Sequence, residues 1–179
     1  MAPKSPAKNA VLCALGCAFL CICAHLAVPF AVPFTMQTFA LSLLLFLLGG
    51  KRTLFCVLLY LAVGARGVPV FAGFTGGIGV FASFSGGFLV GFVVMAGIYA
   101  LFAKNGKRQK RALALAFLAC YATACLWCAC LCAIWGAPMK AAAILSLCVL
   151  PYLLPDLLKA CLAFALAKQL KKSAFFRAL

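Results

Sequence analysis

The sequence predicts an all-α integral membrane protein, built as a single bundle of six transmembrane helices. Of its 179 residues, 68% are hydrophobic and 9% are charged, which is more apolar surface than a soluble domain of this length can bury. Long apolar runs separated by short basic segments are typical of helices, because the strands of a membrane barrel would alternate apolar and polar residues. The whole chain, 1–179, is therefore expected to form one transmembrane domain.

The six expected spans are approximately 10–28, 36–49, 53–65, 84–103, 112–135 and 140–168. The first is polar only at Asn9, next to its start, and at His25. Its apolar run is longer than the hydrophobic region of a usual signal peptide. We therefore expect the segment that follows Lys4 and Lys8 to remain in the protein as a membrane helix.

The second and third spans are short for a hydrocarbon core of roughly 30 Å, so they are expected to pair as a hairpin around the sequence GGKR. A Gly- and Phe-rich segment, 66–83, precedes the fourth span. Eight of the fifteen glycines lie between Gly67 and Gly91, and non-helical backbone at membrane depth survives only where protein or a cavity covers it. The segment predicts an outer loop over a cavity, or else a plain surface loop with interfacial aromatic residues.

The fifth span is a continuous apolar run, whereas the sixth has a proline break near 151–155, at Pro151 and Pro155. Proline suits the first turn of a helix and disrupts its interior. We expect a short segment followed by a helix that begins near Pro155. Asp156, the only acidic residue of the chain, would then lie at the positive end of this helix, which favours an anion.

The distribution of basic residues predicts the topology. If the N-terminus is cytoplasmic, thirteen of the sixteen Lys and Arg residues fall on the inside, two fall on the outside and Lys159 lies within a span. The inside set is Lys4, Lys8, Lys51, Arg52, Lys104, Lys107, Arg108, Lys110, Arg111, Lys168, Lys171, Lys172 and Arg177, and the outside set is Arg66 and Lys140. Cytoplasmic loops carry such an excess, so both termini are expected in the cytoplasm, with the protein crossing the cell membrane several times.

The distribution of charge, the spacing of the cysteines and the absence of certain motifs exclude several functional classes. The net charge of +15 falls in short clusters between apolar spans, which fits anionic lipid rather than nucleic acid. Cys125 and Cys128 form a C-x-x-C on an apolar helix without a second pair or a nearby histidine, so the twelve cysteines are interpreted as packing residues and no metal site is expected. No P-loop and no H-E-x-x-H motif is present. We expect neither an enzyme nor a cofactor.

Two groups of polar residues remain. Thr35, Gln37 and Thr38 bring hydrogen-bonding groups to the start of the second span, for structural bonding or for a ligand. Asp156 and Lys159 are i,i+3 neighbours that can meet on one helix face. Ionised side chains in a span are unfavourable unless they pair or face water. An ion pair explains the geometry, but two apolar residues would be more stable there, so we interpret the pair as functional.

Small residues mark a further surface. Ala10, Ala14 and Ala18 recur every four residues on the first span. Such a stripe lets another helix approach closely, although alanine is abundant enough in this chain to produce it by chance.

The motifs VPFTMQTFA, GVPVFAGFTGGIGVF, SGGFLVGF and LPYLLPDLLKA, taken in order, resemble the BioY family over about residues 10 to 170. These proteins are the biotin-binding S-components of energy-coupling-factor transporters. The resemblance implies a six-helix fold, biotin as the ligand beneath an outer loop, and association with a transmembrane T-component and a pair of ATPases. It also implies that the alanine stripe of the first helix is the docking surface for that partner.

The resemblance and the ligand chemistry together give the expected site. Biotin has two ureido N–H donors, a carbonyl, an apolar thioether ring and a carboxylate, which a carboxylate, aromatic residues and a cation can recognise. The residues expected to contact it are Thr35, Gln37, Thr38, Gly73, Phe74, Phe88, Asp156 and Lys159. The sequence departs from the family pattern at 83–88 and at 154–156. Two alternatives stay open: the same architecture for another vitamin, and a membrane scaffold without a small-molecule ligand.

Overall fold

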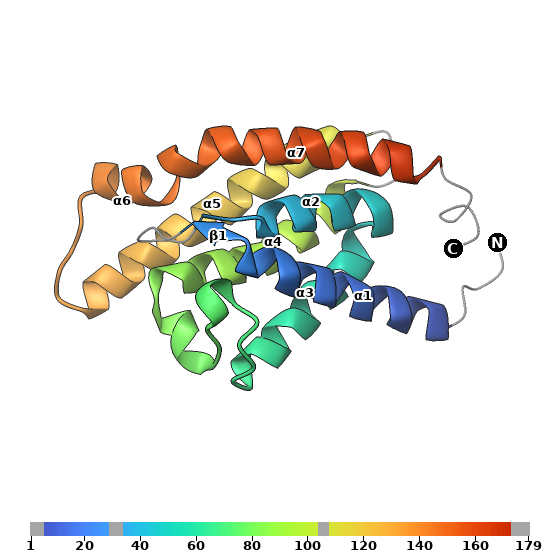
Figure 1. Cartoon of the computed structure of the whole chain (residues 1–179). Coiled ribbons are helices and arrows are strands. Elements are labelled where there is room, and N and C mark those ends of the chain that lie inside the picture. The colour runs from blue at the N-terminus through green and yellow to red at the C-terminus, as the bar shows by residue number, and fades with distance from the viewer. Residues whose placement is uncertain (1–5, 29–33, 104–107, 173–179) are drawn as a thin grey trace.

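The computed structural model describes residues 6–28, 34–103 and 108–172 of the chain, and these form a bundle of helices (Figure 1). The elements in order are α1 (Pro6–His25), β1 (Ala27–Val28), β2 (Phe34–Thr35), α2 (Gln37–Leu48), α3 (Gly50–Ala65), η1 (Ala72–Phe74), η2 (Ile78–Ala82), α4 (Phe84–Phe102), α5 (Gln109–Ile134), α6 (Ala141–Cys148) and α7 (Leu150–Leu170). The prediction of a mostly helical fold with six helical regions is confirmed, with α6 and α7 together forming the sixth.

Four helical regions are long and apolar enough to cross a membrane, namely Ala7–His25, Phe84–Phe102, Gln109–Ile134 and Ala141–Leu170. Helix α2 is equally apolar but only 12 residues long, and α3 has 16 residues. Gly49 alone separates these two helices, with φ +80, so their close connection at the expected hairpin is confirmed. This pattern is that of a multi-pass membrane protein.

The twelve cysteines are free thiols, and several of them pack in the core. Helices α4 and α5 illustrate how closely this core is packed. A Cβ atom at Gly87 would lie 2.7 Å from the Cβ of Trp127, and one at Gly91 would lie 2.8 Å from the Sγ of Cys120. Glycines spaced four apart thus let the two helix backbones approach one another.

The break before α7 differs from the expectation. The expected break near 151–155 lies instead at Val149 (φ −122, ψ −57), and α7 begins at Leu150 with Pro151 in its first turn and Pro155 inside the helix. Pro151 starts the helix because its missing N–H would have no partner in the first turn. The carbonyl of Val149 accepts bonds from the N–H groups of Tyr152 and Leu153, at 3.0 and 3.1 Å. Asp156 therefore lies one turn deeper than predicted, not at the positive end of the helix.

The sequence also did not predict the two-stranded sheet. β1 and β2 pair in antiparallel fashion, with Ala27 opposite Thr35 and Val28 opposite Phe34. Accordingly α1 ends at His25, three residues before the expected boundary at 28. This pairing fixes the chain immediately before α2 and so positions the polar residues that begin that helix.

All the helix ends that carry basic clusters lie at one end of the bundle. In Figure 1 the starts of α1, α3 and α5 and the ends of α2, α4 and α7 lie towards the right of the view. Among residues that the structure describes, this end carries Lys8, Lys51, Arg52, Arg108, Lys110, Arg111, Lys168, Lys171 and Lys172. Arg66, at the end of α3, and Lys140, before α6, belong to the opposite end. The fold therefore separates these described cations into the two groups that the sequence predicts.

Candidate functional site

The two charged residues singled out in the last span form a buried ion pair. Asp156 and Lys159 lie one turn apart on α7, and their exposed fractions are 4% and 7%. The Nζ atom of Lys159 lies 3.0 Å from Oδ1 of Asp156. The spacing thus brings the two charges together as predicted, and their burial means that other groups must replace the lost water.

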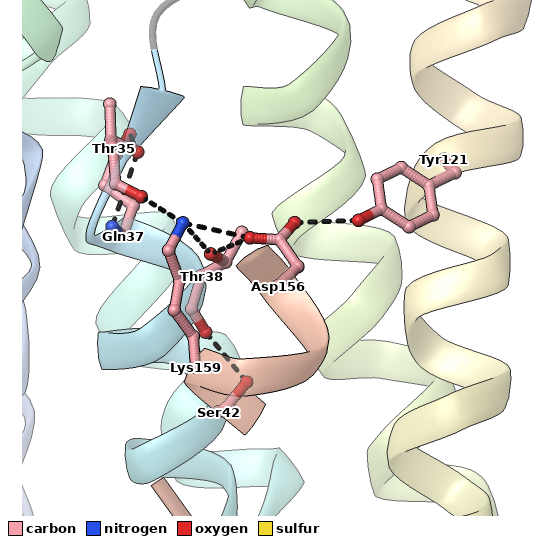
Figure 2. Close-up of polar contacts among 7 residues, drawn as sticks. All are labelled: Thr35, Gln37, Thr38, Ser42, Tyr121, Asp156 and Lys159. Atoms are coloured by element: carbon pink, nitrogen blue, oxygen red, sulfur yellow. Dashed lines mark hydrogen bonds and ion pairs between the residues drawn. The ribbon is translucent and has the colours of Figure 1, made fainter. Parts of the chain in front are cut away.

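The start of α2 supplies those groups (Figure 2). The Thr38 hydroxyl donates to Oδ1 of Asp156 at 2.7 Å and accepts from Nζ of Lys159 at 3.2 Å. Lys159 also donates to the Thr35 carbonyl at 2.7 Å and lies 3.7 Å from the centroid of the Phe34 ring. An ammonium has three donors, and all three of these are engaged. Polar groups just before α2 and in its first turn therefore complete the coordination of the pair.

A third helix reaches the same carboxylate. The hydroxyl of Tyr121, on α5, donates to Oδ2 of Asp156 at 2.8 Å. Tyr121 is not among the residues predicted from the sequence, because its partner is 35 positions away and a tyrosine in an apolar span has no distinguishing spacing. The available signal was the phenol itself, since a buried tyrosine hydroxyl usually finds a partner. Asp156 thus joins α2, α5 and α7.

Gln37 belongs to an adjoining network that leads towards the Gly- and Phe-rich segment. Its Oε1 accepts from the Thr35 hydroxyl at 2.9 Å, and its Nε2 donates to the Tyr60 hydroxyl at 2.7 Å. The Tyr60 hydroxyl in turn donates to the carbonyl of Val70 at 3.2 Å. One N–H of the Gln37 amide remains for another acceptor.

A cavity of about 70 Å³ lies beside both networks. Its polar lining includes Thr35, Gln37, Thr38, Asp156 and Lys159, and the rest comes from 71–80, from α4 and from Tyr152 on α7. Phe88 is part of this wall, with its ring centroid 5.7 Å from that of Tyr152. The cavity therefore combines one carboxylate, one ammonium and one amide with aromatic walls. Such a set suits a small molecule with N–H donors, an acceptor and an apolar ring.

The chain is similar in sequence to the members of one known protein family. A model of the BioY family matches residues 1–175. The chain belongs to the BioY family.

Individual relatives agree with this assignment. The chain is 33% identical over 137 residues to a probable biotin transporter BioY of Pyrococcus horikoshii, covering 76% of this chain and 79% of the relative. It is 46% identical over 85 residues to biotin transporter BioY2 of Lactococcus lactis, an alignment that spans about half of either chain, 47% of each. A solved structure, described as the S-component for biotin from an ECF-type ABC transporter, has the same fold, with a TM-score of 0.79, 22% identity and 96% of both chains covered.

Two residues predicted for the BioY site lie apart from this cavity. Gly73 and Phe74 are both described, and neither lines it. Phe74 is 68% exposed, and its ring stacks on His25 with centroids 4.0 Å apart. Gly73 has φ +69 and Phe74 has φ +58, so the chain turns sharply here and directs the phenylalanine towards α1. Their contact with a ligand stays a prediction, and one that requires this segment to rearrange.

The stripe of small residues keeps its predicted geometry on the BioY fold. Ala10, Ala14 and Ala18 are all exposed on one face of α1. The face is therefore accessible to another helix in the membrane.

Proposed function

We propose that this chain is the substrate-binding membrane subunit for biotin uptake, an S-component that a T-component and a pair of ATPases energise. The observation that carries the proposal is the buried Asp156–Lys159 pair at the wall of an aromatic cavity, in a chain of the BioY family whose relatives are named biotin transporters. A purely structural ion pair would not need to face a cavity.

The chemistry of biotin matches the unused hydrogen-bonding capacity of the cavity. A carboxylate offers about four acceptor sites, and Asp156 uses three of them, for Thr38, Lys159 and Tyr121. A ureido N–H can occupy the remaining site. The spare N–H of Gln37 can meet an oxygen acceptor of the ligand, and Phe88 and Tyr152 can cover the thioether ring. Lys159 can bind biotin only by exchanging one of its present acceptors.

Equilibrium binding to the purified chain tests the proposal. Titration calorimetry with biotin, and in parallel with riboflavin and thiamine, should give saturable heat for biotin alone. Saturation by a different vitamin would transfer the function to that ligand. Saturation by none of them, with a folded protein, would favour the scaffold.

The segment at 66–83 is proposed to act as the outer roof of the site, and it has to move. A cavity of about 70 Å³ is well below the roughly 300–1,000 Å³ of small-molecule pockets. Four of its lining residues, Phe71, Ala72, Thr75 and Val80, belong to this segment. Outward movement followed by closure over the ligand would provide the missing volume.

Hydrogen exchange should detect that closure. We expect saturating biotin to increase amide protection within 66–83, while the cytoplasmic half of α5, 109–121, changes little and serves as the internal control. Unchanged protection in 66–83 at saturation would contradict a role as a roof.

The proposed orientation has both termini in the cytoplasm of a prokaryotic cell. It is supported by the basic residues gathered at one end of the bundle and by relatives from bacteria and archaea. In a bacterial host, a green fluorescent protein fused to the C-terminus should fluoresce, and a protease site inserted in 66–83 should be cut from outside the cell. Cleavage only from the cytoplasmic side would invert the topology.

We further propose that Ala10, Ala14 and Ala18 form the docking surface for the T-component. Ala14→Trp should abolish co-purification with a co-expressed T-component and its ATPases while leaving biotin affinity within about twofold, because an indole prevents close helix approach. Leu126→Trp on α5, which is also highly exposed, 69%, is the matched control and should assemble normally. Normal assembly of Ala14→Trp would exclude this surface.

A further inference from the structure

A second hollow of the molecule lies outside the proposed biotin cavity, between α5 and α7. This groove has a volume of about 530 Å³ and almost entirely apolar walls. On α5 its lining runs from Lys110 to Tyr121, and on α7 from Leu153 to Phe164. Its few polar groups lie at its two ends, with Lys110 at the basic end of the bundle and Tyr121 and Asp156 at the other.

The length of the groove corresponds to one membrane leaflet. Each helix contributes a stretch of eleven residue steps, from 110 to 121 and from 153 to 164. At about 1.5 Å per residue this is about 16 Å, and half of a hydrocarbon core of roughly 30 Å is about 15 Å. An acyl tail that enters at the Lys110 end would therefore reach the level of Tyr121 and Asp156 near the middle of the bilayer.

The mouth of the groove is positively charged, which favours an anionic occupant. The ammonium of Lys110 crosses from α5 to α7 and lies 4.4 Å from the centroid of the Phe164 ring. Lys168 on α7 and Lys171, the residue directly after that helix, follow Phe164 at i+4 and i+7, towards the same face, and all three lysines are exposed. The chain contains only one acidic side chain, that of Asp156 at the other end of the groove, so no acidic side chain neutralises this mouth.

We propose that the groove between α5 and α7 is a binding site for an anionic glycerophospholipid, with its phosphate at Lys110 and Lys168 and one acyl tail along the groove. Basic residues at a helix end attract anionic headgroups, and the apolar walls fit the tail. A second copy of the chain would bring the same lysines to this face and has the same whole-chain net charge of +15, which opposes self-association there. The tail would end against the ring of Tyr121, whose hydroxyl holds Asp156.

Native mass spectrometry of the purified full chain tests this site. Palmitoyl-oleoyl phosphatidylglycerol and phosphatidylcholine carry the same tails and differ in headgroup charge, and we expect preferential retention of phosphatidylglycerol. Lys110→Gln and Lys168→Gln should each lower the retention of phosphatidylglycerol about fivefold. The retention of phosphatidylcholine should not change. Lys140→Gln removes an exposed lysine at the opposite end of the bundle and should have no effect.

A substitution inside the groove separates tail binding from charge alone. Ala114, an exposed groove residue on α5, changed to Trp should reduce phosphatidylglycerol retention with every lysine intact, whereas Ala133→Trp at the far end of α5 should not. Equal retention of the two lipids, or equal losses in Lys140→Gln and Lys110→Gln, would overturn the site. A dimer that disappears on Ala114→Trp would assign the groove to a second copy instead.

Discussion

Asp156→Asn is expected to weaken biotin binding by about 1.5–3 kcal/mol, the usual worth of a hydrogen bond to a charged group. The amide keeps the shape of the side chain and one acceptor oxygen, so the bonds from Thr38 and Lys159 can persist. Its NH₂ group, however, replaces Oδ2 and cannot accept a ureido N–H. Titration calorimetry of the variant against the parent chain measures the loss directly.

Two matched variants show whether that loss comes from the carboxylate itself. Ser42→Ala removes a buried hydroxyl of α2 whose one hydrogen bond within the described part of the chain is to the Thr38 carbonyl, at 2.7 Å (Figure 2), and should leave affinity unchanged. Tyr121→Phe removes the donor to Oδ2 but keeps the charge, so its loss should be smaller than that of Asp156→Asn. An affinity of Asp156→Asn within twofold of the parent would remove this residue from the proposed site.

The residues that the sequence singled out and the structure brings together are those whose polarity is unusual in a membrane span. Thr35, Gln37, Thr38, Asp156 and Lys159 all line one cavity, although α2 and α7 are more than a hundred positions apart. Each is a hydrogen-bonding or charged group in apolar sequence, and burial forces such groups to find one another. Their meeting can therefore be predicted without any knowledge of the packing.

Tyr121 and Tyr60 were not predicted, because a tyrosine is not conspicuous in an apolar span. Their rings are as suited to the core as those of phenylalanine, and both are buried. Only the packing of α5 against the pair, and of α3 against α2, shows that their hydroxyls hold Asp156 and Gln37. Contacts of this kind depend on how each helix is rotated about its own axis relative to its neighbours. A locally apolar sequence does not determine that rotation.

The start of α7 differs from the prediction because of a local backbone choice, and the direction of Phe74 depends on another such choice. Two prolines four residues apart each suit a helix start, and the geometry at Val149 selected Pro151 rather than Pro155. The segment around Gly73 turns through positive φ angles and carries Phe74 to His25. A glycine-rich segment has many accessible conformations, so its direction followed from contacts that composition cannot reveal.

Lys159→Met is expected to have the largest effect on the fold itself. It leaves the carboxylate of Asp156 buried without its cation, and breaking a buried pair from one side destabilises by about 3–5 kcal/mol. The bonds from Thr38 and Tyr121 remain and place the loss towards the lower end of that range. The midpoint of thermal unfolding in detergent should fall clearly, whereas Lys140→Met, at an exposed lysine before α6, should leave it unchanged.

The double variant Asp156→Asn/Lys159→Met separates folding from recognition. With both charges gone, the amide can still accept from Thr38 and bond Tyr121, so the unfolding midpoint should recover most of the loss seen in Lys159→Met. Biotin binding should not recover, because the carboxylate acceptor and the ammonium donor are both missing. In the double variant the unfolding midpoint then recovers while biotin affinity stays low. A pair that only stabilises the bundle cannot produce this difference. If the double variant instead binds biotin as well as the parent chain, Asp156 and Lys159 are structural residues, and the cavity must recognise its ligand through Gln37 and its aromatic walls.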